Sequence, residues 1–269
     1  MSQNRLKKRF AEAKQKGQKV FTAFLTLGYP NLKTTERLIE ASDAMGVDCL
    51  ELGFPFSDPL ADGPTIQFSS QWALDHGVQI EDAFRLVSKM RRKGCQISIV
   101  FFTYFNPVLH YGIQRFVTKA VQAGFDALLV PDLPPEEEKA LNRACRKQGL
   151  AQVYLVAPTT KLERAVRIIK ASEGFIYYVS LRGVTGARRA LPSELHAHLK
   201  ILQKKTRKPI LVGFGVSTPA QAAAIARMSQ GVIVGSAIID QIRRSKGRLQ
   251  PVIQYLRRMV RAVKELPRG

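Results

Sequence analysis

The feature that most constrains this fold is an alternation, repeated eight times along the 269 residues, of an apolar run of strand length with a stretch of apolar residues at helical spacing. The expected strands are residues 20–28, 49–54, 97–104, 127–133, 151–158, 175–183, 209–216 and 231–239. The expected helices between them are residues 32–46, 80–94, 110–124, 134–149, 161–174, 193–207 and 218–229. Pro134 and Pro135, followed by three glutamates, are typical of a helix that begins there. Repeated βα units predict a parallel sheet.

Eight such units favour an α/β fold of the (β/α)8 TIM barrel type over a doubly wound open sheet, which usually has fewer strands. We expect a single barrel domain over residues 1–269, with an extra N-terminal helix in 1–19 and a basic C-terminal helix in 241–269. Two connections from strand to helix are elaborated. Residues 55–79 are long enough to hold a further helix, and residues 183–192 are rich in glycine and charge, which is typical of a lid.

The chain is strongly basic, since 42 lysines and arginines against 21 aspartates and glutamates give a net charge of +21. The excess is concentrated in residues 1–19 and 241–269. A charge of this size attracts polyanions, so a scaffold that binds nucleic acid is one alternative. Solvated helix faces on a generally basic protein are the simpler interpretation, and we favour it.

The composition indicates a cytoplasmic protein without a metal site. No apolar run approaches the ~20 residues of a membrane helix, and the first ten residues carry no apolar signal segment. Cys49, Cys95 and Cys145 are odd in number and far apart, which argues against a disulfide framework and a CxxC metal site. The four histidines lack a matching constellation of cysteines or carboxylates.

The polar residues at the carboxyl ends of barrel strands are the best candidates for chemistry. Strand alternation in 49–54 places Glu51 in the barrel interior, where burial would raise its pKa and make it a proton donor near neutral pH. A structural alternative is a buried glutamate paired with a cation. A second carboxylate, Asp62, follows in a loop rich in glycine and proline, with Asp58 before it. Glu51 and Asp62, in different environments, can divide the labour of acid and base, although Asp58 and Asp62 are also common turn formers.

The junctions after the seventh and eighth strands predict a phosphate site. Gly213 and Gly215 follow one strand, and Gly235 and Ser236 follow the next. In barrels these two junctions often bind phosphate through backbone N–H groups and the N-terminus of a short helix. A single glycine pair of this kind is often only a turn after a strand. Two of them in consecutive units favour the phosphate interpretation.

Four strings at these junctions, GFPFSDPLADGPTIQ, TYFNPVLHYG, LVPDLPPEE and GVTGAR, occur in an order that resembles the α subunit family of tryptophan synthase over nearly the whole chain. The resemblance implies a lyase that splits indole-3-glycerol phosphate into indole and glyceraldehyde 3-phosphate. It implies no cofactor in this chain, and a pyridoxal-phosphate (PLP) β subunit as partner in an α2β2 heterotetramer, which receives indole through a tunnel.

The resemblance also assigns roles to particular residues. Glu51 corresponds to the acid/base that protonates the indole ring at C3, and Asp62 corresponds to the carboxylate that accepts the indole N–H. Tyr177 corresponds to an active-site tyrosine, and the alternative is that it is an aromatic residue of the core. Phe24 and Phe102 fall near apolar lining positions, where ordinary core packing is an equal alternative.

Further assignments concern the lid and the partner. Gly186 corresponds to a third phosphate contact, and Thr185 to a lid residue that contacts Asp62 on closure. Asp58 and the helix entered at Pro107 would face the β subunit. Two departures from the usual pattern, LGYP after the first strand and SLRG at the lid, touch neither Glu51 nor Asp62.

One rival remains among enzymes. Other phosphate-binding barrels isomerise or cyclise related anthranilate-derived phosphosugars, and they commonly need a lysine on an early strand. The strand ends of this chain offer Glu51 and Asp62 instead.

Overall fold

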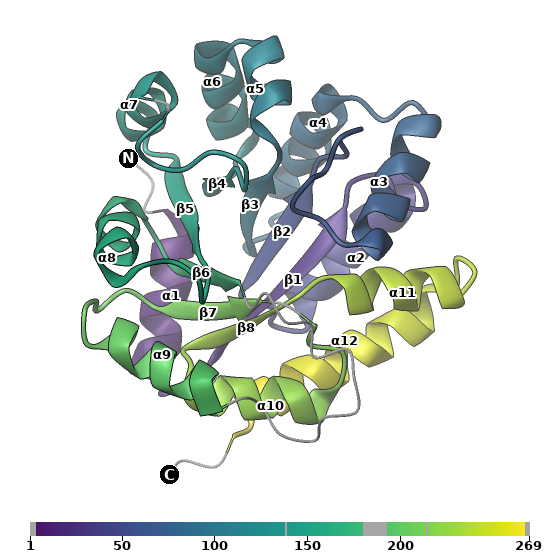
Figure 1. Ribbon diagram of the computed structural model, residues 1–269. Helices are drawn as coiled ribbons and strands as arrows, with labels where there is room; N and C mark the ends of the chain where they lie inside the picture. Colours follow the sequence, from purple (N-terminus) through teal and green to yellow (C-terminus); the bar gives the residue numbers. More distant parts are fainter. Residues whose placement is uncertain (1–3, 138, 180–192, 214, 267–269) are drawn as a thin grey trace.

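Parallel strands close into an eight-stranded barrel in the computed structural model, which describes residues 4–137, 139–179, 193–213 and 215–266 (Figure 1). Each strand pairs with the next along the chain, and the last pairs with the first. The strands are β1 (Val20–Thr26), β2 (Cys49–Gly53), β3 (Ser98–Phe102), β4 (Ala127–Leu129), β5 (Ala151–Val156), β6 (Ile176–Val179), β7 (Ile210–Gly213) and β8 (Gly231–Val234). The predicted (β/α)8 barrel is therefore confirmed, and each observed strand lies within a predicted one.

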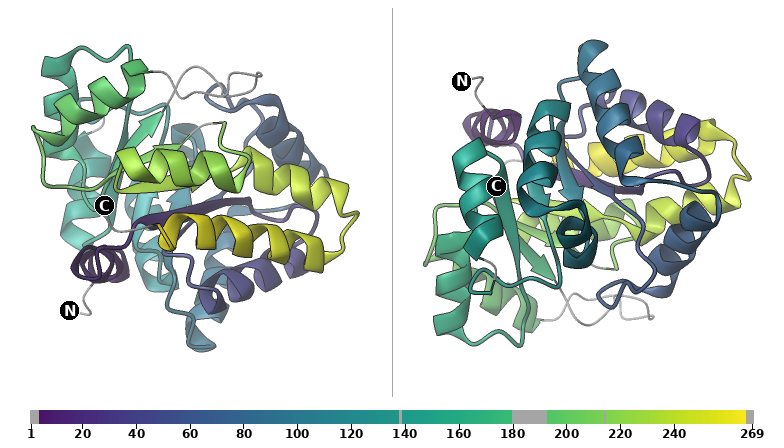
Figure 2. Two further views of the ribbon diagram at one scale, coloured as in Figure 1. Left: turned by 90° about the horizontal axis from the view of Figure 1, so that it is seen from below. Right: turned by 90° about the horizontal axis from the view of Figure 1, so that it is seen from above.

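Helices surround this barrel on its outer side (Figure 2). They are α1 (Arg5–Gln15), α2 (Leu32–Ala44), α3 (Pro64–Asp75), α4 (Ile80–Arg92), α5 (Phe105–Tyr111), α6 (Ile113–Ala123), α7 (Lys139–Gln148), α8 (Leu162–Ala171), α9 (Ser193–Gln203), α10 (Pro219–Met228), α11 (Ser236–Arg244) and α12 (Leu249–Lys264). The extra N-terminal helix is α1, and the helix predicted within residues 55–79 is α3. None of the helices in the described ranges is long and apolar enough to span a membrane.

Three helix predictions need correction. The helix expected from Pro134 begins only at Lys139, because the prolines belong to a preceding turn in which the Glu137 N–H donates to the Pro134 carbonyl. The helix expected over 110–124 is two helices, α5 and α6, separated at Gly112, whose φ of 89° interrupts the helix. The basic segment 241–269 likewise contains the end of α11 and the separate helix α12.

The strand register fixes which side chains enter the barrel. Phe24 of β1 pairs with Glu51 of β2, which in turn pairs with Val100 of β3. Directly paired residues share a face of the sheet, so these three side chains lie at one level inside the barrel. One level below, in the same register, lie Thr22, Cys49 and Ser98. The predicted inward orientation of Glu51 therefore follows from the pairing as well as from the alternation.

A buried aspartate ties the amino-terminal end of the barrel together. The Asp126 carboxylate, just before β4, accepts hydrogen bonds from the Ile99 backbone N–H at 2.9 Å, from Arg91 Nη2 at 2.8 Å and from Arg5 Nη1 at 3.1 Å. Arg91 also donates to the carbonyl oxygen of Gly124. This cluster joins α1 and α4 to the beginnings of β3 and β4.

We predict that Asp126→Ala lowers the free energy of unfolding by about 3–5 kcal/mol, because it leaves the buried Arg91 guanidinium without its counter-charge. Urea denaturation measures the change. The matched control is Glu265→Gln, which breaks an exposed ion pair with Arg261 and should cost at most about 1 kcal/mol. Equal losses in the two variants would contradict the role given to Asp126.

Candidate active site

Glu51 lies in the middle of β2, with 1% of its surface exposed. Its Oε1 atom has no hydrogen-bond partner, and it forms no salt bridge within the described ranges. Burial alone raises the pKa of Glu51 to about 8. The alternative of a structural glutamate paired with a cation is therefore not supported, and the carboxyl group holds its proton at neutral pH.

Asp62 lies in the loop between β2 and α3, two residues before the first residue of that helix. Its Oδ2 atom accepts a hydrogen bond from the Tyr104 hydroxyl at 3.0 Å, and its backbone N–H donates to the Pro59 carbonyl at 3.0 Å. The hydrogen bond between the Asp62 N–H and the Pro59 carbonyl closes a turn, as expected of a turn-forming aspartate. The Asp62 side chain takes no part in that turn and instead contacts Tyr104. Burial raises the pKa of Asp62 to about 6, while the hydrogen bond from Tyr104 acts in the opposite direction.

Tyr177 lies on β6 near both carboxyl groups, and we call the region around Glu51, Asp62 and Tyr177 the chamber. Burial raises the pKa of its hydroxyl well above the ordinary value, and the charges of Glu51 and Asp62 raise it further. Tyr177 therefore lies close enough to both Glu51 and Asp62 to be affected by their charges. The neighbouring Tyr178 faces outward, as its alternation predicts, and its hydroxyl lies 2.8 Å from Nδ1 of His198 on α9.

Glycines make room for the aromatic rings of the chamber. A Cβ atom at Gly213 would lie 2.7 Å from Cε1 and Cζ of Tyr177, and one at Gly53 would lie 2.7 Å from Cε2 of Phe24. Phe24 also packs edge to face against Phe102, with ring centroids 5.4 Å apart. The two phenylalanines come from β1 and β3, the strands on either side of Glu51, so the acid stands between apolar walls.

The predicted phosphate residues lie at the ends of two adjacent strands. Gly213 ends β7, Gly215 follows it closely, and Gly235 and Ser236 lead from β8 into α11. The Ile238 and Ile239 N–H groups donate to the Gly235 carbonyl, which leaves the N–H groups of the first residues of α11 available to an anion. A Cβ atom at Gly235 would lie 3.4 Å from Cβ of Phe24, so this junction borders the same chamber.

The remaining predicted residues lie elsewhere. Thr185 and Gly186 fall outside the described residues. Asp58 is exposed in the loop after β2, and Pro107 is half-buried in α5. Tyr104 was not predicted as a site residue, although its position directly after β3, inside the string TYFNPVLHYG, is a signal that could have identified it.

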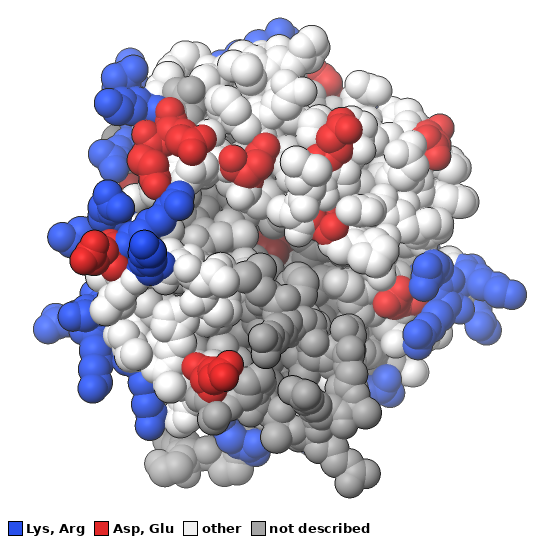
Figure 3. All heavy atoms as spheres, viewed as in Figure 1, with Lys and Arg blue, Asp and Glu red and all other residues white. Residues whose placement is uncertain are grey.

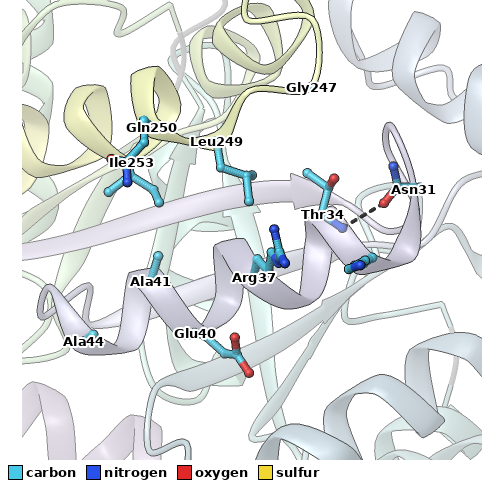
Figure 4. Close-up of a pocket in the computed structure, with 11 residues that line it drawn as sticks. Asn31, Thr34, Arg37, Glu40, Ala41, Ala44, Gly247, Leu249, Gln250 and Ile253 are labelled. Atoms are coloured by element: carbon cyan, nitrogen blue, oxygen red, sulfur yellow. Dashed lines mark hydrogen bonds between the residues drawn. The ribbon is translucent and has the colours of Figure 1, made fainter.

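The described residues also form a groove away from the predicted site. The groove in Figure 4, of about 780 Å³, lies between α2 and α12 and is lined by residues such as Arg37, Glu40 and Ile253, none of them predicted for the site. Among the described residues, no group of three or more histidines, cysteines or carboxylates could hold a metal ion.

Comparisons with known proteins point to one family. Residues 10–267 match the family described as "Tryptophan synthase alpha chain". The tryptophan synthase alpha chain of Citrifermentans bemidjiense is 44% identical over 262 residues, which are 97% of each chain. The solved structure of tryptophan synthase subunit alpha from Legionella pneumophila has a TM-score of 0.90 at 36% identity, over 97% of this chain and 99% of that chain. A chain of tryptophan synthase from M. tuberculosis has a TM-score of 0.87 at 31% identity, over 97% and 99%.

We predict that Glu51→Gln stabilises the protein increasingly as the pH rises. Below pH 4.5, the ordinary value, the carboxyl group is protonated in both the folded and unfolded states. Between that pH and about 8 only the unfolded state releases the proton, so the wild type loses roughly 1.4 kcal/mol of stability per pH unit relative to the glutamine variant. Above the folded pKa the difference stays constant.

Urea denaturation at pH 5, 6.5 and 8 measures this difference. Glu137→Gln, at an exposed position, is the control for substitutions that remove a carboxyl group from the surface. A gap between wild type and Glu51→Gln that stays the same at all three values would show that the pKa of Glu51 is not raised.

Proposed function

Because the chain belongs to the tryptophan synthase alpha chain family, whose members are enzymes of tryptophan biosynthesis, we propose that it cleaves indole-3-glycerol phosphate to indole and glyceraldehyde 3-phosphate. The observation that carries the proposal is the buried carboxyl group of Glu51, whose Oε1 atom has no hydrogen-bond partner among the described residues; its burial raises the pKa to about 8. A carboxyl group that keeps its proton at neutral pH is suited to general acid catalysis.

The reaction breaks the bond between indole C3 and the glycerol side chain. Glu51 donates its proton to C3, which interrupts the aromaticity of the ring and places positive charge on N1. Asp62, ionised above a pKa of about 6, accepts the N1–H hydrogen bond and stabilises that charge. The Glu51 carboxylate then takes the proton of the side-chain hydroxyl. As the aldehyde C=O forms, the electrons of the broken bond return to the ring, and Glu51 is again protonated.

The phosphate end of the substrate is assigned to the junctions after β7 and β8. Gly213, Gly215, Gly235 and Ser236 would hold it through backbone N–H groups and the N-terminus of α11, with Ser236 adding its hydroxyl. Phe24, which contacts the Gly235 junction and lies beside Glu51, would place the indole between the two ends. By family resemblance, Gly186 adds a third contact and Thr185 closes over Asp62.

This chain would need no cofactor, and the PLP of the complex would belong to a β subunit that receives the indole in an α2β2 assembly. The contact surface is assigned to the loops after β2 and β3, which contain Asp58 and Pro107. Leu60 and Leu109 in these segments are 93% and 54% exposed. Residues 54–84 and 94–114 contain none of the 42 lysines and arginines, so this apolar surface lacks basic side chains.

The two rival functions have less support. An isomerase or cyclase of related phosphosugars would commonly need a lysine on an early strand, and β1, β2 and β3 contain none. A nucleic-acid scaffold would use the basic side chains, which in Figure 3 gather at the left margin and, on the right, over the end of α11. The central hollow of that face contains an acidic side chain instead.

We predict that Glu51→Gln and Asp62→Asn each lower the turnover of indole-3-glycerol phosphate by at least about 10²-fold, because general acid/base groups contribute on that scale. Indole release by the purified chain with its matched β subunit measures the rate. Glu137→Gln is the control and should keep wild-type turnover. Absence of indole release by the wild-type pair would refute the proposed function.

We also predict that the chain purifies with a PLP protein and that Leu60→Asp weakens this complex by about tenfold or more, since it places a charge in an apolar contact. Ile201→Asp, at a 45% exposed position on α9, is the matched control and should bind normally. Binding is measured by titration of the PLP absorbance. Equal affinities of the two variants would remove the loop after β2 from the interface.

A further inference from the structure

Tyr104 is a buried residue that contacts Asp62 directly, and the proposed reaction assigns it no role. It lies at the N-cap of α5 with 2% of its surface exposed, and its ring stacks on Phe56 with centroids 5.3 Å apart. Its hydroxyl makes two hydrogen bonds to the loop after β2, one with the Ala61 N–H at 3.0 Å and one with Asp62 Oδ2 at 3.0 Å.

The directions of these two hydrogen bonds are fixed by chemistry. The Ala61 backbone N–H can only donate, so the phenol oxygen accepts there and directs its single proton to Asp62. Burial and the nearby Asp62 raise the pKa of Tyr104, so the phenol keeps this proton at neutral pH. A hydrogen bond of this kind is stronger to an ionised carboxylate than to a neutral carboxyl group.

We propose that Tyr104 is a positioning residue for the proposed cleavage: its hydroxyl holds Asp62 in the ionised form and aims the other carboxylate oxygen, Oδ1, at the substrate. The inference rests on the proposed function, since it assigns the orientation of the group that accepts the indole N–H. It concerns a side chain that does not itself touch the reacting atoms.

Hydrogen bonds also fix the backbone next to Tyr104. The next N–H, of Phe105, donates to the two carboxylate oxygens of Asp132 at 3.0 and 3.3 Å, so the loop after β4 fixes the start of α5. Asp62 is thereby connected through Tyr104 to the loops after β3 and β4. A displacement of α5 would consequently move the Asp62 carboxylate.

The charged surroundings of Asp62 favour its neutral form without Tyr104. Burial is the largest influence on the pKa of Asp62 and raises it. Among the described residues, Tyr177 and Tyr104 lie close enough to Asp62 to be affected by its charge, Glu51 lies near Tyr177, and Asp132 lies near Tyr104. None of these groups is a cation. Within this set of residues, the phenol proton of Tyr104 therefore offsets the burial of the carboxylate.

The test is the pH profile of kcat/KM for indole release by Tyr104→Phe in complex with the matched β subunit. We expect its acid limb, which lies near pH 6 in the wild type, to move upward by roughly one pH unit. The rate would then fall about fivefold at pH 6 and less than about threefold at pH 7.5.

Tyr154→Phe is the matched control. Tyr154 is also buried, and its hydroxyl donates to Asn142 Oδ1 on α7 at 2.8 Å, so the variant loses one phenol hydrogen bond away from the site. If both variants keep the wild-type acid limb, Tyr104 has only a packing role and the inference fails while the proposed function stands. If the wild type releases no indole, the proposed function itself fails.

A substrate-free measurement keeps the inference testable if Tyr104→Phe assembles poorly with its partner. The ¹³C chemical shift of the Asp62 carboxyl carbon, followed against pH, should give a higher pKa in Tyr104→Phe than in the wild type and Tyr154→Phe. At pH 6, where Tyr104→Phe alone costs about fivefold, adding it in the Asp62→Asn background should change the residual rate less than about twofold, because the two residues act as one unit. Full additivity of the two substitutions would overturn the inference.

Discussion

The structure depends on one unfavourable placement, the burial of the Glu51 carboxyl group among apolar walls with no cation from the described part of the chain beside it. In water this group would be ionised at neutral pH, whereas in the barrel burial raises its pKa to about 8. Each pKa unit of that shift lowers the free energy of unfolding by about 1.4 kcal/mol at a pH above the folded-state pKa. The strand pairing on both sides of β2 prevents the side chain from turning out to solvent. The carboxyl group therefore stays buried and protonated, which suits it to proton donation.

Buried carboxylates at the other end of the barrel show the opposite arrangement. Asp126 is compensated by Arg91, Arg5 and a backbone N–H, and Asp48 by Lys264 Nζ at 2.8 Å and the Phe21 N–H at 2.9 Å. These fully paired groups join the outer helices to the strand beginnings. The two ends of the barrel therefore use carboxyl groups differently. At the amino-terminal end, Asp126 and Asp48 are paired with cations and stabilise the fold. At the carboxyl-terminal end, Glu51 and Asp62 have no cation beside them among the described residues.

Strand periodicity predicted the barrel and the inward orientation of Glu51, because both depend on local alternation. It could not predict Tyr104, since the contact between that hydroxyl and Asp62 joins two loops whose approach is set by the closed barrel. The prolines at 134 and 135 were misplaced for a related reason: helix-start signals also suit a turn, and only the tertiary structure decides between them. The glycines at 53 and 213 were visible in the sequence, but the rings they accommodate come from other strands.

The charge distribution suits the anionic substrate of the proposed cleavage. Two ionised carboxylates beside a phosphate ester would repel it, and the raised pKa of Glu51 removes one of those charges at neutral pH. Backbone N–H groups at the start of α11 can stabilise the negative charge of the phosphate by hydrogen bonds. No cation is then needed near Glu51, where it would lower the pKa of the carboxyl group. The net charge of +21, carried mainly outside the loops after β2 and β3, attracts the anion at long range. The basic surface and the chamber, in which the described residues place no cation, are thus complementary parts of one electrostatic arrangement for the proposed reaction.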